Sequence, residues 1–128
     1  MTIHGPKGER TAKVEELYAG YLETTLAPAE LITQVRIPAL GARKAAYLKG
    51  TTRSADDWPA VGVAVVLEGE KVTIVVGAAT DRPTRLASAE AIDTLPIEGD
   101  LHGSASYKKH LVGVYLKRAV NEARNASH

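Results

Sequence analysis

The stretch AVGVAVVLEGEKVTIVVGAA, residues 60–79, decides how this chain folds. In its first half Val61, Val63, Val65 and Leu67 share one face and Gly62, Ala64 and Val66 line the other, a period of two that is typical of a β-strand. Glu68-Gly69-Glu70 is a short turn, and the apolar run from residue 71 predicts the returning strand of a hairpin. Because both faces of this hairpin are largely apolar, we expect it to be central in a sheet covered on at least one side.

Further strands are predicted on the N-terminal side of this hairpin. Residues 1–13 form a predicted hairpin, in which MTIH and ERTAK flank a turn at GPKG. ELITQVRIP, residues 30–38, alternates and then stops at a proline, which predicts a strand. ARKAAYLKG, residues 42–50, predicts a strand by a weaker pattern.

Three segments have helical spacing. VEELYAGYLE, residues 14–23, predicts a short helix, and TRLASAEAIDTL, residues 84–95, predicts a second helix with Ser88, Ala91, Ile92 and Leu95 on one face. The last helix is expected over residues 104–123, with Ser104 and Ser106 as caps. Its predicted apolar stripe is Tyr107, Leu111, Val114, Tyr115 and Ala119, and its predicted solvated side chains are Lys108, Lys109, Lys117 and Arg118.

This order of elements, mainly strands and then helices, predicts an α+β fold with an antiparallel sheet, helices packed on one face and a long C-terminal helix. The length of 128 residues suits a single domain. Within it, residues 1–29 are interpreted as a lead-in of hairpin and short helix, and residues 30–128 as the α+β domain. With no Phe, the core has to be built from Val, Leu, Ile and Ala.

Composition excludes several classes of function. Sixteen Lys and Arg against fifteen Asp and Glu give a net charge of +1, which offers no electrostatic case for nucleic acid or an anionic membrane. The absence of cysteine excludes disulfides, thiolate metal sites and a Cys nucleophile. With no signal-peptide core and no apolar run of spanning length, we expect a cytoplasmic protein without a membrane span. Four scattered histidines and the glycines of GPKGE predict neither a metal site nor a phosphate loop.

A polar group lies between two predicted strands, in YLKGTTRSADDWPAVGVAV, residues 47–65. Its members are Lys49, Arg53, Asp56, Asp57 and Trp58. One interpretation is a polar loop whose charges pair across the turn while the indole covers the end of the hairpin. The other is a site that contacts an anionic or flat aromatic ligand. The local sequence leaves both interpretations open.

Four segments in order resemble one family. The first segment is GPKGERT with LYAGYLETTLAPAELITQVRIPA, and the others are YLKGTTRSADDWPAVGVAV, VVGAATDRPTRLASAEA and GSASYKKHLVGVYLKRAV. Together they are similar to the C-terminal domain of the FAD-binding (medium) subunit of molybdenum hydroxylases. This family contains carbon monoxide dehydrogenase and xanthine dehydrogenase. Gly77-Ala78 stands where the family has paired glycines, and the resemblance covers nearly the whole chain.

The resemblance implies a role in electron transfer from iron–sulfur clusters to FAD. Lys49 matches the lysine that approaches the flavin, and Arg53 the arginine of the adjacent loop. Asp56 and Asp57 match the acidic part of that loop, and Trp58 follows it. These five would be the cofactor-binding residues, and none would be catalytic.

The implied partners are an FAD-binding domain or subunit, an iron–sulfur subunit and a molybdopterin subunit. With no evident diphosphate site, the isolated chain is expected to bind FAD weakly or not at all, and not to be catalytic alone. The alternative from another class is a free-standing interaction or dimerisation module that keeps the fold without flavin. Substrate, electron acceptor and oligomeric state, a homo-oligomer included, are left open.

Overall fold

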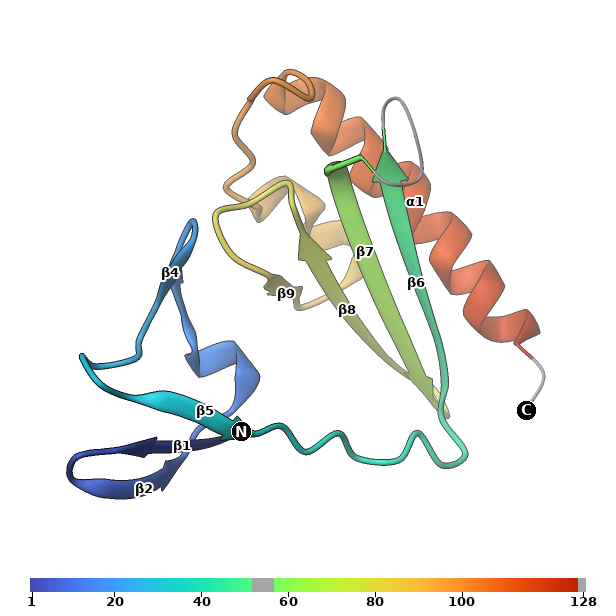
Figure 1. Cartoon of the computed structure of the whole chain (residues 1–128). Helices are drawn as coiled ribbons and strands as arrows, with labels where there is room; N and C mark the ends of the chain where they lie inside the picture. Colours follow the sequence, from blue (N-terminus) through green and yellow to red (C-terminus); the bar gives the residue numbers. More distant parts are fainter. Residues whose placement is uncertain (52–56, 127–128) are drawn as a thin grey trace. The chain divides into compact units, whose positions relative to one another are not determined.

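The computed structural model describes residues 1–51 and 57–126. The chain divides into two compact units, residues 1–39 and residues 40–128 (Figure 1). We refer to them as the N-terminal unit and the C-terminal unit. Their secondary structure differs: the N-terminal unit contains short strands and one 3₁₀ turn, and the C-terminal unit contains the longer strands and the long helix.

The C-terminal unit is built on a four-stranded antiparallel sheet in the order β6-β7-β8-β9. Its strands are β6 (Lys44–Thr51), β7 (Pro59–Glu68), β8 (Lys71–Gly77) and β9 (Thr84–Leu86). Strands β7 and β8 are the predicted hairpin, closed at Gly69, which has a φ of 58°. The hairpin is central in the sheet, since β6 and β9 pair with its outer edges, and this confirms the prediction from residues 60–79.

A single long helix, α1 (Ala105–Asn125), covers one face of this sheet (Figure 1). The Ser104 side chain accepts a hydrogen bond from the Tyr107 N–H at 3.2 Å, so its predicted capping role is confirmed. At the other end of the helix, Lys44 Nζ donates to the Arg124 carbonyl at 2.8 Å. The α+β prediction of an antiparallel sheet with a long C-terminal helix is therefore confirmed.

The core lies between the sheet and α1 and contains only small and branched aliphatic side chains, in keeping with the absence of Phe. The strands contribute Val61, Val63, Val65, Ile74, Val76 and Leu86, and the helix contributes Val112, Leu116, Ala119 and Ala123. The predicted apolar stripe of α1 is rotated from the buried face of the helix, although its member Ala119 is buried as predicted. Tyr107 is 48% exposed, and Leu111, Val114 and Tyr115 are half-buried at the margin, whereas Val112 and Leu116 are buried.

The two shorter helices were predicted wrongly in type and extent, although Ala91, Ile92 and Leu95 of the second do pack against the core as predicted. Residues 84–95 form strand β9 and then a 3₁₀ helix, η2 (Ala89–Thr94), because Thr84–Leu86 pairs with β8 and brings Leu86 into the core. Residues 14–23 form one 3₁₀ turn, η1 (Val14–Glu16), and strand β3 (Tyr18–Gly20), which pairs with β4 (Glu23–Thr24). The chain reverses between β3 and β4 at Leu22, whose φ is 57°.

The N-terminal unit holds a three-stranded sheet in the order β2-β1-β5. Strands β1 (Thr2–Gly5) and β2 (Gly8–Thr11) form the predicted hairpin, and β5 (Leu31–Gln34) pairs antiparallel with β1. The predicted strand at residues 30–38 is thus confirmed in its first half only. Because β5 pairs with β1, residues 31–34 belong to the N-terminal unit, whereas the predicted boundary was after residue 29.

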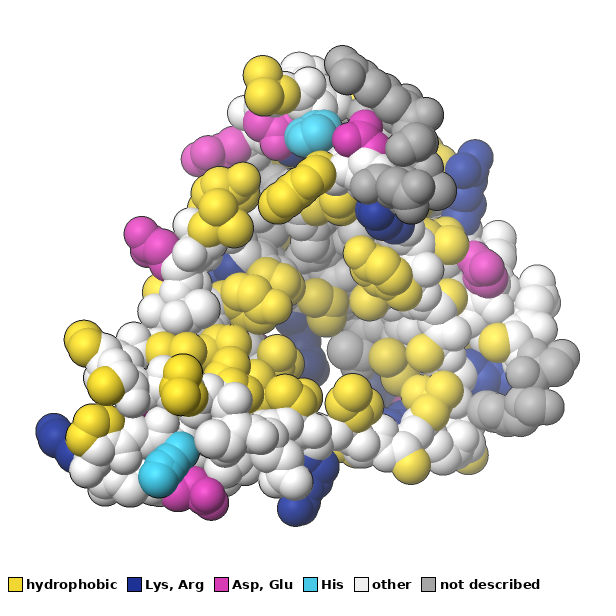
Figure 2. All heavy atoms as spheres, in the orientation of Figure 1, with side chains coloured by type: hydrophobic (Ala, Val, Ile, Leu, Met, Phe, Trp, Pro, Cys, Tyr) yellow, Lys and Arg dark blue, Asp and Glu magenta, His cyan; other side chains and the backbone are white. Residues whose placement is uncertain are grey.

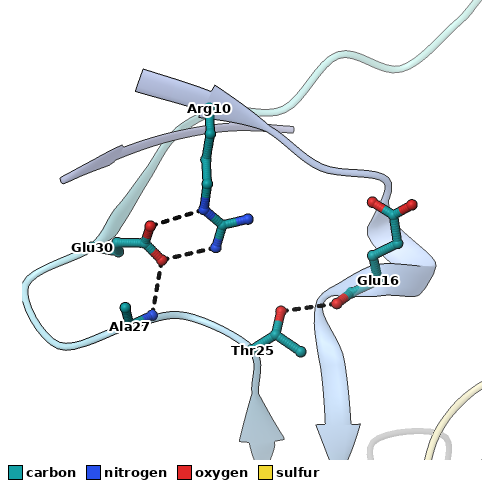
Figure 3. Close-up of polar contacts among 5 residues, drawn as sticks. All are labelled: Arg10, Glu16, Thr25, Ala27 and Glu30. Atoms are coloured by element: carbon teal, nitrogen blue, oxygen red, sulfur yellow. Dashed lines mark hydrogen bonds and ion pairs between the residues drawn. The ribbon is translucent and has the colours of Figure 1, made fainter. Parts of the chain in front are cut away.

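Polar contacts hold the segment between β2 and β5 in the N-terminal unit (Figure 3). Arg10 Nε and Nη2 donate to the two carboxylate oxygens of Glu30, each at 2.8 Å. The Ala27 N–H donates to Glu30 at 2.8 Å, and the Thr25 hydroxyl donates to the Glu16 carbonyl at 2.8 Å. The hydrogen bonds from Arg10 and Ala27 lower the pKa of Glu30 from 4.5 to about 2.

Candidate functional site

The candidate site lies at the end of the sheet where β6 finishes and β7 begins. Lys49 is exposed in β6 and pairs with Gly62 of β7. Asp57 and Trp58 immediately precede β7, and Trp58 is 66% exposed. The Asp57 side chain accepts a hydrogen bond from the Trp58 N–H at 3.0 Å. Arg53 and Asp56 lie outside the described residues.

Lys49 projects from the face of the sheet opposite α1. A Cβ placed on its neighbour Gly50 would lie 2.9 Å from Val61 Cγ2 and 3.0 Å from Tyr115 Cζ, an atom of α1. Gly50 therefore faces the helix. Because successive side chains of a strand point to opposite faces, Lys49 and Tyr47 share the other face.

Two paired glycines make part of that face shallow. Gly62 of β7 is directly opposite Gly77 of β8 in the register. A Cβ on Gly62 would lie 2.9 Å from Tyr47 Oη, so the absence of a side chain lets the Tyr47 ring lie across β7. A Cβ on Gly77 would meet nothing within 4 Å, so the surface there is open. Lys49 and Tyr47, which is 64% exposed, thus border a strip of sheet in which the Tyr47 ring covers Gly62 and the surface at Gly77 is open.

The loop that leaves β8 at this same end begins in a strained conformation. Ala78 has a φ of 63°, a left-handed geometry that glycine adopts freely and alanine does not. A glycine at position 78 would adopt this backbone conformation without strain. Strain of this kind often accompanies functional sites. Two hydroxyl groups fix the following turn, since Thr80 and Thr84 both donate to the Arg82 carbonyl.

An electrostatic contact that the sequence did not predict joins the first turn of α1 to the loop before it. Lys108, expected to be solvated, is 2% exposed, and its Nζ lies 2.6 Å from Asp100 Oδ2. Asp100 also accepts from the His102 N–H at 2.8 Å. Partial burial acts to raise the pKa of Asp100, but the hydrogen bonds from Lys108 and His102 outweigh it and hold this pKa below its ordinary value.

This second contact is structural in character. Asp100 and Gly103 exchange backbone hydrogen bonds of 3.0 and 3.2 Å, so the turn between them is closed and anchored to α1 through Lys108. An amphiphilic helix pattern gives no sign of such a lysine, because it assigns every charged side chain to the solvent face. The feature of the sequence that could have indicated this contact is Asp100, in the loop before α1.

The described residues supply few other kinds of site. Within residues 1–51 and 57–126 no three His, Asp or Glu side chains gather closely enough to hold a metal ion. No helix in the described part of the chain is long and apolar enough to cross a membrane. At this end of the sheet the described residues supply a cation, Lys49, an acid, Asp57, and two exposed aromatic side chains, Tyr47 and Trp58, and the surface at Gly77 is open.

Comparison with known proteins identifies relatives of this arrangement. The chain is 30% identical to the carbon monoxide dehydrogenase medium chain of Afipia carboxidovorans, covering 95% of this chain and 51% of that one. It is also 30% identical to the nicotine 6-hydroxylase medium subunit of Paenarthrobacter nicotinovorans, over 96% of this chain and 51% of that one. The chain is a homologue of these medium subunits. The predicted resemblance is therefore confirmed, although no protein-family model matches.

Solved structures agree with the sequence relatives. A carbon monoxide dehydrogenase from Hydrogenophaga pseudoflava that lacks the Mo-pyranopterin moiety of its cofactor matches 95% of this chain with a TM-score of 0.86 and 28% identity, and 51% of that chain is covered. Quinoline 2-oxidoreductase from Pseudomonas putida 86 shares the fold, with a TM-score of 0.79 at 20% identity. The chain spans about half the length of the curated relatives it matches, as expected for the C-terminal domain of such a subunit.

Proposed function

We propose that this chain acts as the C-terminal domain of the FAD-binding subunit of a molybdenum-hydroxylase-type oxidoreductase. In this role its four-stranded sheet flanks the flavin while a separate region of the subunit holds the rest of FAD. The supporting observation is the match to medium subunits along 95% of this chain, combined with the exposed, cation-bordered strip at the end of β6 and β7.

The residues present fit a flat ring. The open surface at Gly77 accepts a planar group without a steric clash, and exposed aromatic side chains at positions 47 and 58 offer faces or edges to it. FAD held there would accept and pass on electrons, with iron–sulfur and molybdopterin subunits as partners. A phosphate-binding loop is missing from the sequence, so we expect the isolated chain to bind FAD weakly.

Lys49 is the residue with the clearest proposed role. An ammonium group near the ring favours negative charge on the reduced flavin, so it raises the tendency of the flavin to accept electrons. Asp57, whose carboxylate accepts a hydrogen bond from the Trp58 N–H, places the opposite charge just before β7, at the same end of the sheet. Arg53 and Asp56 are proposed as part of this loop on the resemblance alone.

The test is flavin kinetics in a complex reconstituted with an FAD-binding half and an iron–sulfur subunit. We expect Lys49→Met to slow flavin reduction or reoxidation by roughly 10-fold, about 1.4 kcal/mol of barrier. The matched control is Lys71→Met, an exposed lysine at the opposite end of the β7–β8 hairpin, which should change neither rate. A silent Lys49→Met with an intact fold, or micromolar binding of FAD by the isolated chain, would contradict the proposal.

A further inference from the structure

A tyrosine shares a strand face with the lysine proposed to act on the flavin. Tyr47 and Lys49 are two positions apart in β6, so both side chains lie on the face of the sheet opposite α1. Directly across from Lys49 on β7 is Gly62, and directly across from Tyr47 is Ala64. Figure 2 looks onto this side of the sheet and shows both hydrophobic side chains and Lys or Arg side chains on it. Across the strand pair, the lysine therefore faces a glycine.

The Tyr47 ring fills the position that Gly62 leaves without a side chain. A Cβ on Gly62 would lie 2.9 Å from Tyr47 Oη, 3.4 Å from its Cε2 and 3.5 Å from its Cζ, so the ring lies over the glycine. The two residues are diagonal neighbours in the register, and this diagonal of about 7–8 Å is within reach of an aromatic side chain. Both strands belong to the C-terminal unit, so the contact is fixed within that unit.

The ring borders the stem of Lys49 without binding its charge. Residues directly opposite in an antiparallel pair have Cβ positions about 4.5–5.5 Å apart, so a ring over Gly62 is adjacent to the base of the lysine side chain. In the described residues, the one cation that lies over an aromatic ring is Arg118, 5.6 Å from the centroid of Tyr115. The Lys49 ammonium group therefore does not stack on Tyr47. A lysine stem has four flexible carbons, and its direction is set only where a neighbour limits it.

We propose that Tyr47 is a positioning residue for Lys49. Its ring, lying over Gly62, blocks the rotamers that would lay the lysine stem across β7, and so keeps the ammonium group on the β6 side of the face that flanks the flavin. The inference rests on the proposed function and adds to it the pair of residues that orients the cation. Gly62 belongs to the device because a side chain at this position displaces the ring.

The first test is NMR of the full chain without flavin. We expect nuclear Overhauser effects from the Tyr47 ring to the Lys49 methylene protons, whose signals should lie upfield of those of the exposed Lys71 because of the ring current. Tyr47→Phe keeps the ring and should keep both observations. Tyr47→Leu should abolish them, and so should Gly62→Ala, whose methyl group displaces the ring. The matched control, Gly77→Ala, adds a methyl group in open space on the neighbouring strand and should leave them unchanged.

The second test separates positioning from a purely structural role, in the reconstituted complex used for Lys49→Met. Tyr47→Leu should slow flavin reduction or reoxidation about 3-fold, about 0.7 kcal/mol of barrier, whereas Tyr47→Phe should keep most of the wild-type rate. In the Lys49→Met background, Tyr47→Leu should cause no further loss, because the side chain that it positions is gone. An equal loss in both backgrounds would overturn the inference, since Tyr47 would then act independently of Lys49.

Two NMR results would also overturn it. One is a set of Lys49 signals that Tyr47→Leu leaves unchanged, and the other is an equal change of these signals in Gly77→Ala. Tyr47→Leu leaves the backbone of β7 as it is, so it decides the question even if thermal unfolding shows that Gly62→Ala does not fold. If the ring contact is present while Lys49→Met is kinetically silent, the positioning of Lys49 is upheld and the flavin role is contradicted.

Discussion

The two units differ in how they are stabilised. Of the thirteen hydrophobic side chains buried in the described residues, all but Ile3 belong to the C-terminal unit. Of the fourteen large hydrophobic side chains that are exposed in the same residues, eight belong to the N-terminal unit. The C-terminal unit is thus stabilised by apolar burial, and the N-terminal unit by strand pairing and exposed polar contacts such as Arg10 with Glu30.

A chain that matches half of a larger subunit can therefore contain one unit with a hydrophobic core and another unit without one. A sheet covered by a helix on one face has a core of its own. In residues 1–39, all of which the structure describes, Ile3 is the only hydrophobic side chain that is buried.

The largest effect is expected from the same substitution made in each unit. Leu116→Ala removes a side chain that is 3% exposed in the core of the C-terminal unit, and we expect it to lower the free energy of unfolding by about 2–5 kcal/mol. Leu31→Ala, at 70% exposure in the N-terminal unit, should change this free energy by less than about 0.5 kcal/mol. Urea unfolding of both variants provides the measurement, and equal effects would contradict the comparison.

An intermediate effect is expected at the buried lysine. Asp100→Asn leaves the Lys108 ammonium group, 2% exposed, without its carboxylate partner, so the free energy of unfolding should fall by roughly 1–3 kcal/mol. Adding Lys108→Met should restore most of it, because no buried charge then remains. The matched control is Asp93→Asn, which breaks the 2.8 Å ion pair between Asp93 and Lys109. Because the Asp93 side chain is 83% exposed and the Lys109 side chain 43% exposed, this change should alter thermal unfolding little.

If Asp100→Asn alone leaves thermal unfolding unchanged, the ion pair does not stabilise the turn at residues 100–103. The wild type should also lose this contribution at acid pH. The pKa of Asp100 is lowered in the folded protein, so the stabilisation is complete above the unfolded-state value and disappears as the pH falls through the folded one. The Asn variant should lack this part of the acid dependence.

The sequence predicted the C-terminal unit well where one pattern decides the structure. Alternation identified β7 and β8, and helical periodicity together with a capping serine identified α1. The buried face of α1 was predicted wrongly because large side chains were assigned to the core. In the structure Val112, Leu116 and Ala123 are buried together with Ala119, which was predicted, and Tyr107 and Tyr115 lie at the margin.

The two short helices were predicted wrongly for a different reason. Helices of ten to twelve residues are marginal without tertiary contacts, so a nearby strand edge can take over the segment. Residues 84–86 pair with strand β8 instead of forming a helix. In residues 14–23, the positive φ of Leu22 reverses the chain, which is incompatible with a continuous helix. At the candidate site, the sequence and the family resemblance indicated Lys49, whose role stays a prediction. They did not indicate Tyr47 or the Gly62–Gly77 pair, because strand register is absent from a linear pattern.

The smallest effect is expected from protonation in the N-terminal unit. Because the folded pKa of Glu30 is about 2 against an ordinary 4.5, its contacts with Arg10 and Ala27 should persist at pH 4 and weaken as the pH falls toward 2. We expect the amide signals of Ala27 and the Nε–H of Arg10 to titrate by NMR with a midpoint near 2, and Glu30→Gln to abolish the transition. The matched control is Glu9→Gln in the exposed strand β2, which should leave it unchanged. A midpoint near 4.5 would contradict the prediction and show that these polar contacts do not hold the unit.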